Sequence, residues 1–213
     1  MRNIFTMRLI RLGSRTFTLL ELLIVIGIIA ILATITLVIF DRGEVFKKAR
    51  DHQRITDLNR LNRALTVLST EVANFDQGNV MTVYTSLPDA TPTCDSWVPN
   101  LPALPSGWSY HCAPSGNLKQ INGTGWLPVN FTQSQLLDLP ELPVDPLAPR
   151  AYYTYVVGHS WELETSLIES TYYRTEVAPK DGGTDPVRYE VGTDLVLTPA
   201  SIEAAPEVAL PAP

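Results

Sequence analysis

Proline is missing from the first 87 residues of the chain, and glycine is rare there. All 17 prolines lie at or beyond Pro88, and only three of the 12 glycines precede residue 78. A proline inside a helix costs roughly 3 kcal/mol, because it removes a hydrogen bond and clashes with the preceding turn. The N-terminal third of the chain is therefore free to form one long helix.

Histidine and cysteine are also scarce, which argues against several kinds of site. The three histidines, His52, His111 and His159, lie in no recognisable nucleophile motif, so we expect no enzyme activity. Cys94 and Cys112 are the only cysteines, and with one nearby histidine they cannot supply the four ligands of a structural zinc site. An even number of cysteines outside the cytoplasm favours a disulfide between them, with two reduced thiols as the alternative.

Basic residues are few in the C-terminal two thirds of the chain. Residues 77–213 hold five basic residues against 15 acidic ones, a net charge of −10, whereas residues 41–76 hold seven against six. Contacts with phosphate need lysine and arginine, so no general nucleic-acid binding is expected. We interpret the acidic part as a soluble exposed surface.

The most prominent feature that is present is an apolar run with one carboxylate, Glu21. From Leu22 to Phe40 there are 19 residues without a formal charge, about the length that crosses a hydrocarbon core as a helix. Residues 1–20 carry four arginines and no acid, which predicts a cytoplasmic N-terminus and an extracytoplasmic remainder. Glu21 is then either an interfacial residue at the edge of a membrane anchor or a carboxylate that pairs with a cation from another molecule.

The residues around Glu21 resemble a known processing signal. The heptapeptide Phe17-Thr18-Leu19-Leu20-Glu21-Leu22-Leu23 is similar to the signature of type IV pilins and type II secretion pseudopilins. The resemblance implies that a prepilin peptidase removes the leader 1–16 by cutting between Thr16 and Phe17 and methylates the new Phe17 amine. Gly or Ala normally precedes the cut, where this chain has Thr16. In the family Glu21, the fifth mature residue, is thought to pair with the Phe17 amine of a neighbouring subunit.

This resemblance implies a structural function. The protein is expected to be a subunit of a type IV pilus-like filament that serves adhesion, motility or DNA uptake. The expected partners are prepilin peptidase, identical or related pilin subunits, an inner-membrane assembly platform and membrane lipid. The expected location is the inner membrane, as a single-pass protein, and then an extracellular filament. The alternatives are a pseudopilin of a type II secretion system, or a membrane-anchored extracytoplasmic binding module or enzyme.

Beyond the apolar run, residues 41–76 continue the predicted helix with an amphipathic pattern. One apolar stripe repeats at spacings of three and four residues, and charged residues occupy the other faces. The stripe is expected to pack on the protein's own sheet. It comprises Ile55, Leu58, Leu61, Leu65, Leu68, Val72 and Phe75, and the charged residues are Asp51, Arg54, Asp57, Arg60 and Arg63.

The remaining residues divide by composition. Residues 77–150 are rich in proline, glycine, serine and asparagine and are predicted to be loops around Cys94 and Cys112. Residues 151–198 are predicted to form an antiparallel sheet, with a two-residue turn at Gly158-His159. The tail 199–213 lacks aromatic residues and is predicted to be disordered.

In the strand 160–167, alternation predicts one buried and one solvated face. The buried set is Trp161, Leu163, Thr165 and Leu167, and the solvated set is Glu162, Glu164 and Ser166.

The fold expected from these elements is α+β and pilin-like. It has a long N-terminal α-helix, half membrane-spanning and half amphipathic, packed on a small antiparallel β-sheet. Segments of the sheet region loosely resemble G-type pseudopilins, some of which carry a calcium loop. That resemblance makes Asp181, Asp185 and Asp194 weak calcium candidates, with a polar turn as the alternative; no other cofactor is expected.

Overall fold

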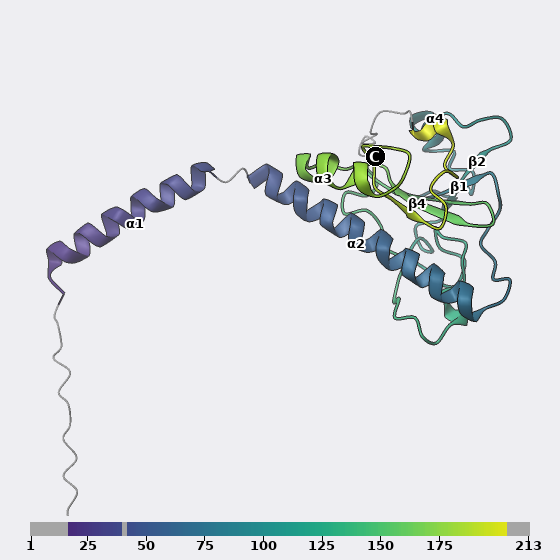
Figure 1. Ribbon diagram of the computed structural model, residues 1–213, viewed down its shortest axis with the longest axis horizontal. Coiled ribbons are helices and arrows are strands. Elements are labelled where there is room, and N and C mark those ends of the chain that lie inside the picture. Colours follow the sequence, from purple (N-terminus) through teal and green to yellow (C-terminus); the bar gives the residue numbers. More distant parts are fainter. Residues whose placement is uncertain (1–16, 40–41, 204–213) are drawn as a thin grey trace, which may run out of the picture. The chain divides into compact units, whose positions relative to one another are not determined.

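The computed structural model describes residues 17–39 and 42–203. The chain divides between residues 42 and 43 into two compact units, which are described separately. Helix α1 (Leu19–Ile39) belongs to the first unit, and helix α2 (Arg42–Glu71) leads into the second (Figure 1). The prediction of one long helix from residue 17 to residue 76 is therefore wrong. Residues 40 and 41 and the predicted leader 1–16 lie outside the described residues.

Five strands form a mixed sheet in the order β2-β1-β3-β4-β5. Strands β1 (Thr82–Pro88) and β2 (Ser109–Ala113) pair in parallel, whereas β3 (Tyr153–Val157), β4 (Trp161–Thr165) and β5 (Glu190–Gly192) extend the sheet antiparallel. The predicted small antiparallel sheet is thus wrong in two respects. One strand pair is parallel, and two strands come from the region predicted to be loops. Strand β1 lies between β2 and β3 and is buried on both faces, so it lacks the polar alternation that marks a half-exposed strand.

Short helical segments lie between and after the strands. Helix α4 (Ala200–Glu203) ends the described part of the chain, and its Ile202 is only 2% exposed in an apolar cluster. The prediction of disorder therefore fails for residues 199–203, and the rest of that tail lies outside the described residues. The segments are η1 (Val98–Asn100), η2 (Phe131–Gln133), α3 (Thr171–Glu176), η3 (Ala178–Lys180) and α4 (Ala200–Glu203).

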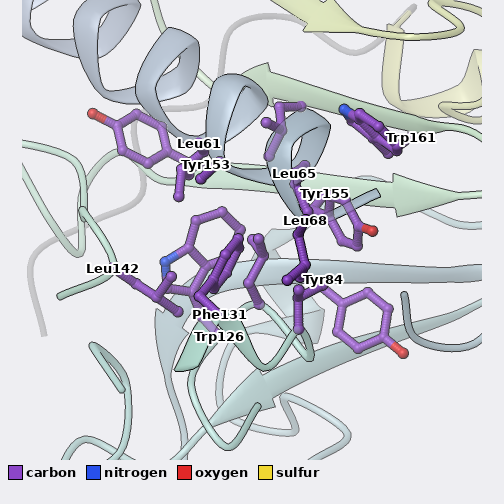
Figure 2. Packing of buried hydrophobic residues seen from close by; sticks show 14 of the residues in the cluster. Leu61, Leu65, Leu68, Tyr84, Trp126, Phe131, Leu142, Tyr153, Tyr155 and Trp161 are labelled. Atoms are coloured by element: carbon purple, nitrogen blue, oxygen red, sulfur yellow. The ribbon is translucent and has the colours of Figure 1, made fainter. Parts of the chain in front are cut away.

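Helix α2 packs its predicted apolar stripe on one face of the sheet. Leu61, Leu65 and Leu68 are fully buried beside Tyr155 and Trp161 of the strands, and Figure 2 shows these side chains gathered beneath the helix. The stripe prediction is confirmed for the leucines. Each large apolar side chain that leaves water contributes about 1.5–3 kcal/mol, so this face is the main core of the second unit.

The opposite face of the sheet is buried as well. Val83 and Val156 pack there with Tyr110 and Ile202 in a second apolar cluster. Glu162, Glu164 and Ser166, predicted to be solvated, are each about 1% exposed on this face. That prediction is wrong because segments distant in the sequence cover the strand.

The loop between β3 and β4 is longer than predicted. Val157 pairs with Trp161, which leaves residues 158–160 in the loop. His159 adopts a left-handed conformation with φ of 75°. The predicted two-residue turn is therefore a three-residue connection, and the left-handed residue in it is consistent with the common three-residue hairpin geometry.

Two of the charged residues predicted to lie off the apolar stripe of α2, Asp51 and Arg54, are fully buried. Arg54 donates from Nε and Nη2 to Asp145, at 2.7 and 3.1 Å, and from Nη1 to Asp51 at 2.7 Å and Glu169 at 3.0 Å. Asp51 in turn accepts the backbone N–H groups of Glu169 and Ser170. This network fixes α2 to two loops of the second unit, and its bidentate geometry is the strong form of an arginine–carboxylate pair.

Candidate functional site: helix α1 and its first turn

The first turn of α1 is capped by the side chain of Thr18. The Glu21 N–H donates to Thr18 Oγ1 at 3.2 Å, and the Leu22 N–H donates to the Thr18 carbonyl oxygen at 3.2 Å. Thr18 followed three residues later by Glu21 has the spacing of a capping box, in which Thr satisfies an otherwise unpaired N–H. Phe17 and Leu22 occupy the flanking positions at which apolar residues form a hydrophobic staple. The heptapeptide that resembles the pilin signature is therefore also a strong helix start signal.

The described surface of α1 is apolar on every side. Glu21 is the only charged residue from Phe17 to Thr34, and a carboxylate in the first turn is favourable to the helix dipole. Exposed fractions of the large apolar side chains run from 41% at Val25 to 83% at Leu19. A helix that is hydrophobic all round is normally buried against something else. The exposed set is Leu19, Leu20, Leu22, Leu23, Ile24, Val25, Ile26, Ile28, Ile29, Ile31 and Leu32.

Within the described ranges, no helix is long and apolar enough to cross a membrane. This finding contradicts the predicted membrane-spanning half of the helix and the single-pass location in the inner membrane.

The two processing residues lie at the edge of the described chain. Phe17 is the first described residue and is 72% exposed, while Thr16 lies outside the described residues. The cut between them stays a prediction. Phe17 directly precedes the helix cap, so cleavage there would place the new amine one residue before Thr18.

Cys94 and Cys112 form a disulfide with a Cα–Cα separation of 5.2 Å. Both sulfurs lie in the second apolar cluster, and Thr85 Oγ1 lies 3.2 Å from Cys112 Sγ. The bridge joins the loop before η1 to the edge strand β2. It therefore acts as a brace on the sheet face opposite α2.

The three calcium candidates are used locally in the structure. Asp181 accepts the N–H groups of Gly183 and Glu190 at 2.8 Å each, and Asp185 accepts the N–H of Val187 at 2.9 Å. Asp194 accepts the Ser160 hydroxyl at 3.4 Å. Among the residues that the structure describes, no group of three or more histidine, cysteine, aspartate or glutamate side chains is arranged to hold a metal ion.

A buried acidic cluster on the second face of the sheet was missed by the sequence analysis. Glu162 accepts the N–H groups of Leu197 and Thr198 at 2.8 and 2.7 Å, which ties β4 to the C-terminal segment. Glu164 pairs with Arg188 at 2.8 Å, both nearly fully buried. Arg188 is one of only five basic residues in 77–213, and its position in so acidic a segment is the signal that could have indicated an ion pair.

Burial raises the pKa of three carboxyl groups in this cluster. The pKa of Glu190 rises to about 9, mainly because its side chain is out of water and next because it shares a hydrogen bond with Glu162. Burial likewise raises the pKa of Glu162, and it raises that of Glu164 to about 7 against the opposing effect of Arg188. Burial and the neighbouring carboxyl group therefore make the pair Glu162 and Glu190 hold a proton more tightly than exposed carboxyl groups would.

The three histidines lie in different parts of the second unit and are not grouped into one site. His52 is exposed on α2 with Nδ1 3.2 Å from the Tyr173 hydroxyl, and His111 lies half-buried in β2 beside the Tyr84 ring. Burial lowers the pKa of His111. His159 lies in the β3–β4 loop. Each therefore has a different structural neighbourhood.

Comparisons with known proteins found no family model, no curated protein and no solved structure that matches this chain. The apolar side chains of α1 are exposed, whereas those of the α2 stripe are buried.

Proposed function

We propose that the protein is a structural subunit of a type IV pilin-like filament, assembled through helix α1. The observation that carries this proposal is the apolar surface of α1, exposed all round from Leu19 to Leu32. Burying each such side chain is worth about 1.5–3 kcal/mol, so helices that pack side by side gain a large driving force. Identical helices supply that surface most simply, because each copy carries the same length and the same apolar composition.

Glu21 gives the proposed bundle a means of setting register. A carboxylate that enters an apolar bundle loses its water and needs a compensating cation. We assign that cation to the amine of Phe17 on a neighbouring copy, created when prepilin peptidase cuts between Thr16 and Phe17. The resemblance of the heptapeptide 17–23 to the pilin signature supports this assignment. A pairing of this kind fixes how far one helix is displaced along the next.

The second unit would then be the part that each subunit displays along the filament. Its sheet is braced on one face by α2 and on the other by the disulfide. Bracing on both faces suits a module that must resist mechanical force. A pseudopilin of a type II secretion system would assemble by the same chemistry. The length of the filament distinguishes a pilus subunit from a pseudopilin.

The test is assembly in cells that also express prepilin peptidase. We expect sheared filaments by electron microscopy and a mature peptide that begins at Phe17 by mass spectrometry. Leu23→Asp, which puts a charge on the exposed face of α1, should abolish filaments. The matched control Leu136→Asp changes a leucine that is 75% exposed in the second unit and should assemble normally. Filaments of Leu23→Asp subunits at wild-type levels would contradict the proposal, and short filaments confined to the cell envelope would favour the pseudopilin.

A further inference from the structure

An apolar groove of about 520 Å³ lies between the η1 loop and the start of strand β2. Every residue that lines it is uncharged, and its chemistry is dominated by aliphatic, proline and aromatic side chains. The Tyr110 hydroxyl donates to the Pro102 carbonyl oxygen at 2.8 Å, so this polar group is already satisfied within the wall. The lining includes Val98, Leu101, Pro102, Leu104, Trp108 and Tyr110.

The last described turn of the chain reaches the same part of the molecule. Ile202 of α4 is 2% exposed in the apolar cluster that contains Leu101 and Tyr110, and Trp108 packs against that cluster. Figure 1 shows α4 at the side of the sheet where β1 and β2 lie. The chain therefore leaves the described structure next to the groove.

The ten residues that follow are suited in chemistry and length to this groove. Residues 204–213 read Ala-Ala-Pro-Glu-Val-Ala-Leu-Pro-Ala-Pro, with Glu207 as the only charge. Ten residues span at most about 33 Å, and prolines favour an extended conformation that has no internal hydrogen bonds. Extended proline-containing segments dock into grooves lined by aromatic side chains.

We propose that residues 204–213 bind the apolar groove between the η1 loop and strand β2 of their own chain, with Val208 and Leu210 as apolar anchors. Attachment at α4 gives the segment a local concentration in the millimolar range, so modest contacts suffice to hold it. The segment would cover an apolar surface that the sheet otherwise leaves open. This inference is independent of the proposed assembly through α1.

The experiment uses a spin label on the segment and the amide signals of the groove. The native cysteines are joined to each other, so Ala212→Cys in the full chain, kept in a mild detergent, provides one labelling site. We expect the nitroxide to cause loss of the amide signals of residues 98–110, with recovery when ascorbate reduces the label. Intact signals in the presence of the active label would overturn the proposal.

Two variants and one mixture complete the test. Ala103→Asp places a charge on an exposed position of the groove wall and should restore the signals, while Leu136→Asp, exposed elsewhere, should not. The amides of β1 in Ala103→Asp report whether the sheet is intact. Isotope-labelled chains mixed with spin-labelled unlabelled chains should show no signal loss. Loss in the mixture would mean that the segment binds a second copy, and would overturn binding within one chain.

Discussion

Arg54 Nε lies 2.7 Å from Asp145 Oδ2, and both side chains are fully buried. The pair joins residues 91 positions apart and holds α2 against the loop that precedes β3. Two further carboxylates, Asp51 and Glu169, contact the same guanidinium. Arg54 is therefore shared by three carboxylates, one of which, Glu169, also accepts from Arg50 Nε at 2.6 Å and Nη2 at 2.8 Å.

Replacement of Arg54 should destabilise the second unit strongly. Arg54→Ala removes the guanidinium that pairs with the buried Asp51 and Asp145, while Glu169 keeps Arg50. The loss of one partner from a buried pair typically costs about 3–5 kcal/mol. Arg54→Lys should also be destabilising, because an ammonium cannot form the bidentate contact with Asp145. Urea denaturation followed by tryptophan fluorescence measures the effect. The control Arg63→Ala, exposed on the same helix, should change the free energy of unfolding by no more than about 0.5 kcal/mol; equal effects of Arg54→Ala and Arg63→Ala would contradict this account.

The sequence predicts the α2 core but not this junction, and the reason is physical. A stripe of leucines at spacings of three and four is a local pattern, so the burial of Leu58 to Leu68 could be predicted directly. Arg54 looks like any solvated helix residue until the loops that carry Asp145 and Glu169 are placed beside it. Similarly, Glu162 and Glu164 alternate with apolar residues as they would in a strand with one solvent-exposed face. That face is buried only because Arg188 and the C-terminal segment cover it.

The disulfide should stabilise one face of the sheet without being needed for the other. Closing a loop with a sequence separation of 18 contributes about 3 kcal/mol in the chain-entropy model. Reduction should therefore lower the unfolding free energy and increase hydrogen exchange in residues 94–112. Helix α2 packs on the opposite face of the sheet, so its hydrogen exchange, measured at neutral pH without denaturant, should change less than that of residues 94–112. The double variant Cys94→Ser/Cys112→Ser should match the reduced protein and ignore added reductant. Two reactive thiols in the untreated protein would show that the bridge is absent.

The raised pKa of Glu190 predicts that the stability of the folded protein falls as the pH rises. Its pKa is about 9 in the folded protein, above the ordinary carboxyl value of about 4.3 in an unfolded chain. A raised pKa means that the folded state holds the proton more tightly, so the contribution is complete below the unfolded pKa and is lost as the pH rises through about 9. Glu164, with its pKa raised to about 7, acts in the same direction. Denaturation midpoints measured from pH 5 to pH 9 should therefore decrease.

The variant Glu190→Gln isolates that contribution. An amide can donate a hydrogen bond to Glu162 as the protonated carboxyl does, but it does not titrate. Its midpoint should accordingly vary less with pH than that of the wild type, and the gap between the two should widen toward pH 9. Glu141→Gln, at a half-exposed ion pair with Lys119, is the matched control and should follow the wild-type curve. A Glu190→Gln curve parallel to the wild type over the whole range would refute the shared proton.

The last prediction separates the start of helix α1, capped by Thr18, from the proposed intermolecular ion pair of Glu21. Glutamine serves at the third position of a capping box as glutamate does, but it carries no charge. Glu21→Gln should therefore preserve the first turn of α1 while removing the partner of the Phe17 amine. Thr18→Ala does the reverse, since it removes the cap, at a cost of about 1 kcal/mol, and keeps the carboxylate.

If pairing governs assembly, Glu21→Gln and Glu21→Ala should both be cut at Phe17 yet be strongly depleted from sheared filaments. Loss of one partner from a buried pair costs about 3–5 kcal/mol, which corresponds to at least a hundredfold shift toward unassembled subunits. Glu21→Asp should be intermediate, because it keeps the charge but shortens the reach, and Thr18→Ala should assemble nearly as well as the wild type. Immunoblots of filament and cell fractions, with circular dichroism of the purified variants, provide the comparison. Wild-type incorporation of Glu21→Gln together with poor incorporation of Thr18→Ala would mean that Glu21 acts only to start the helix.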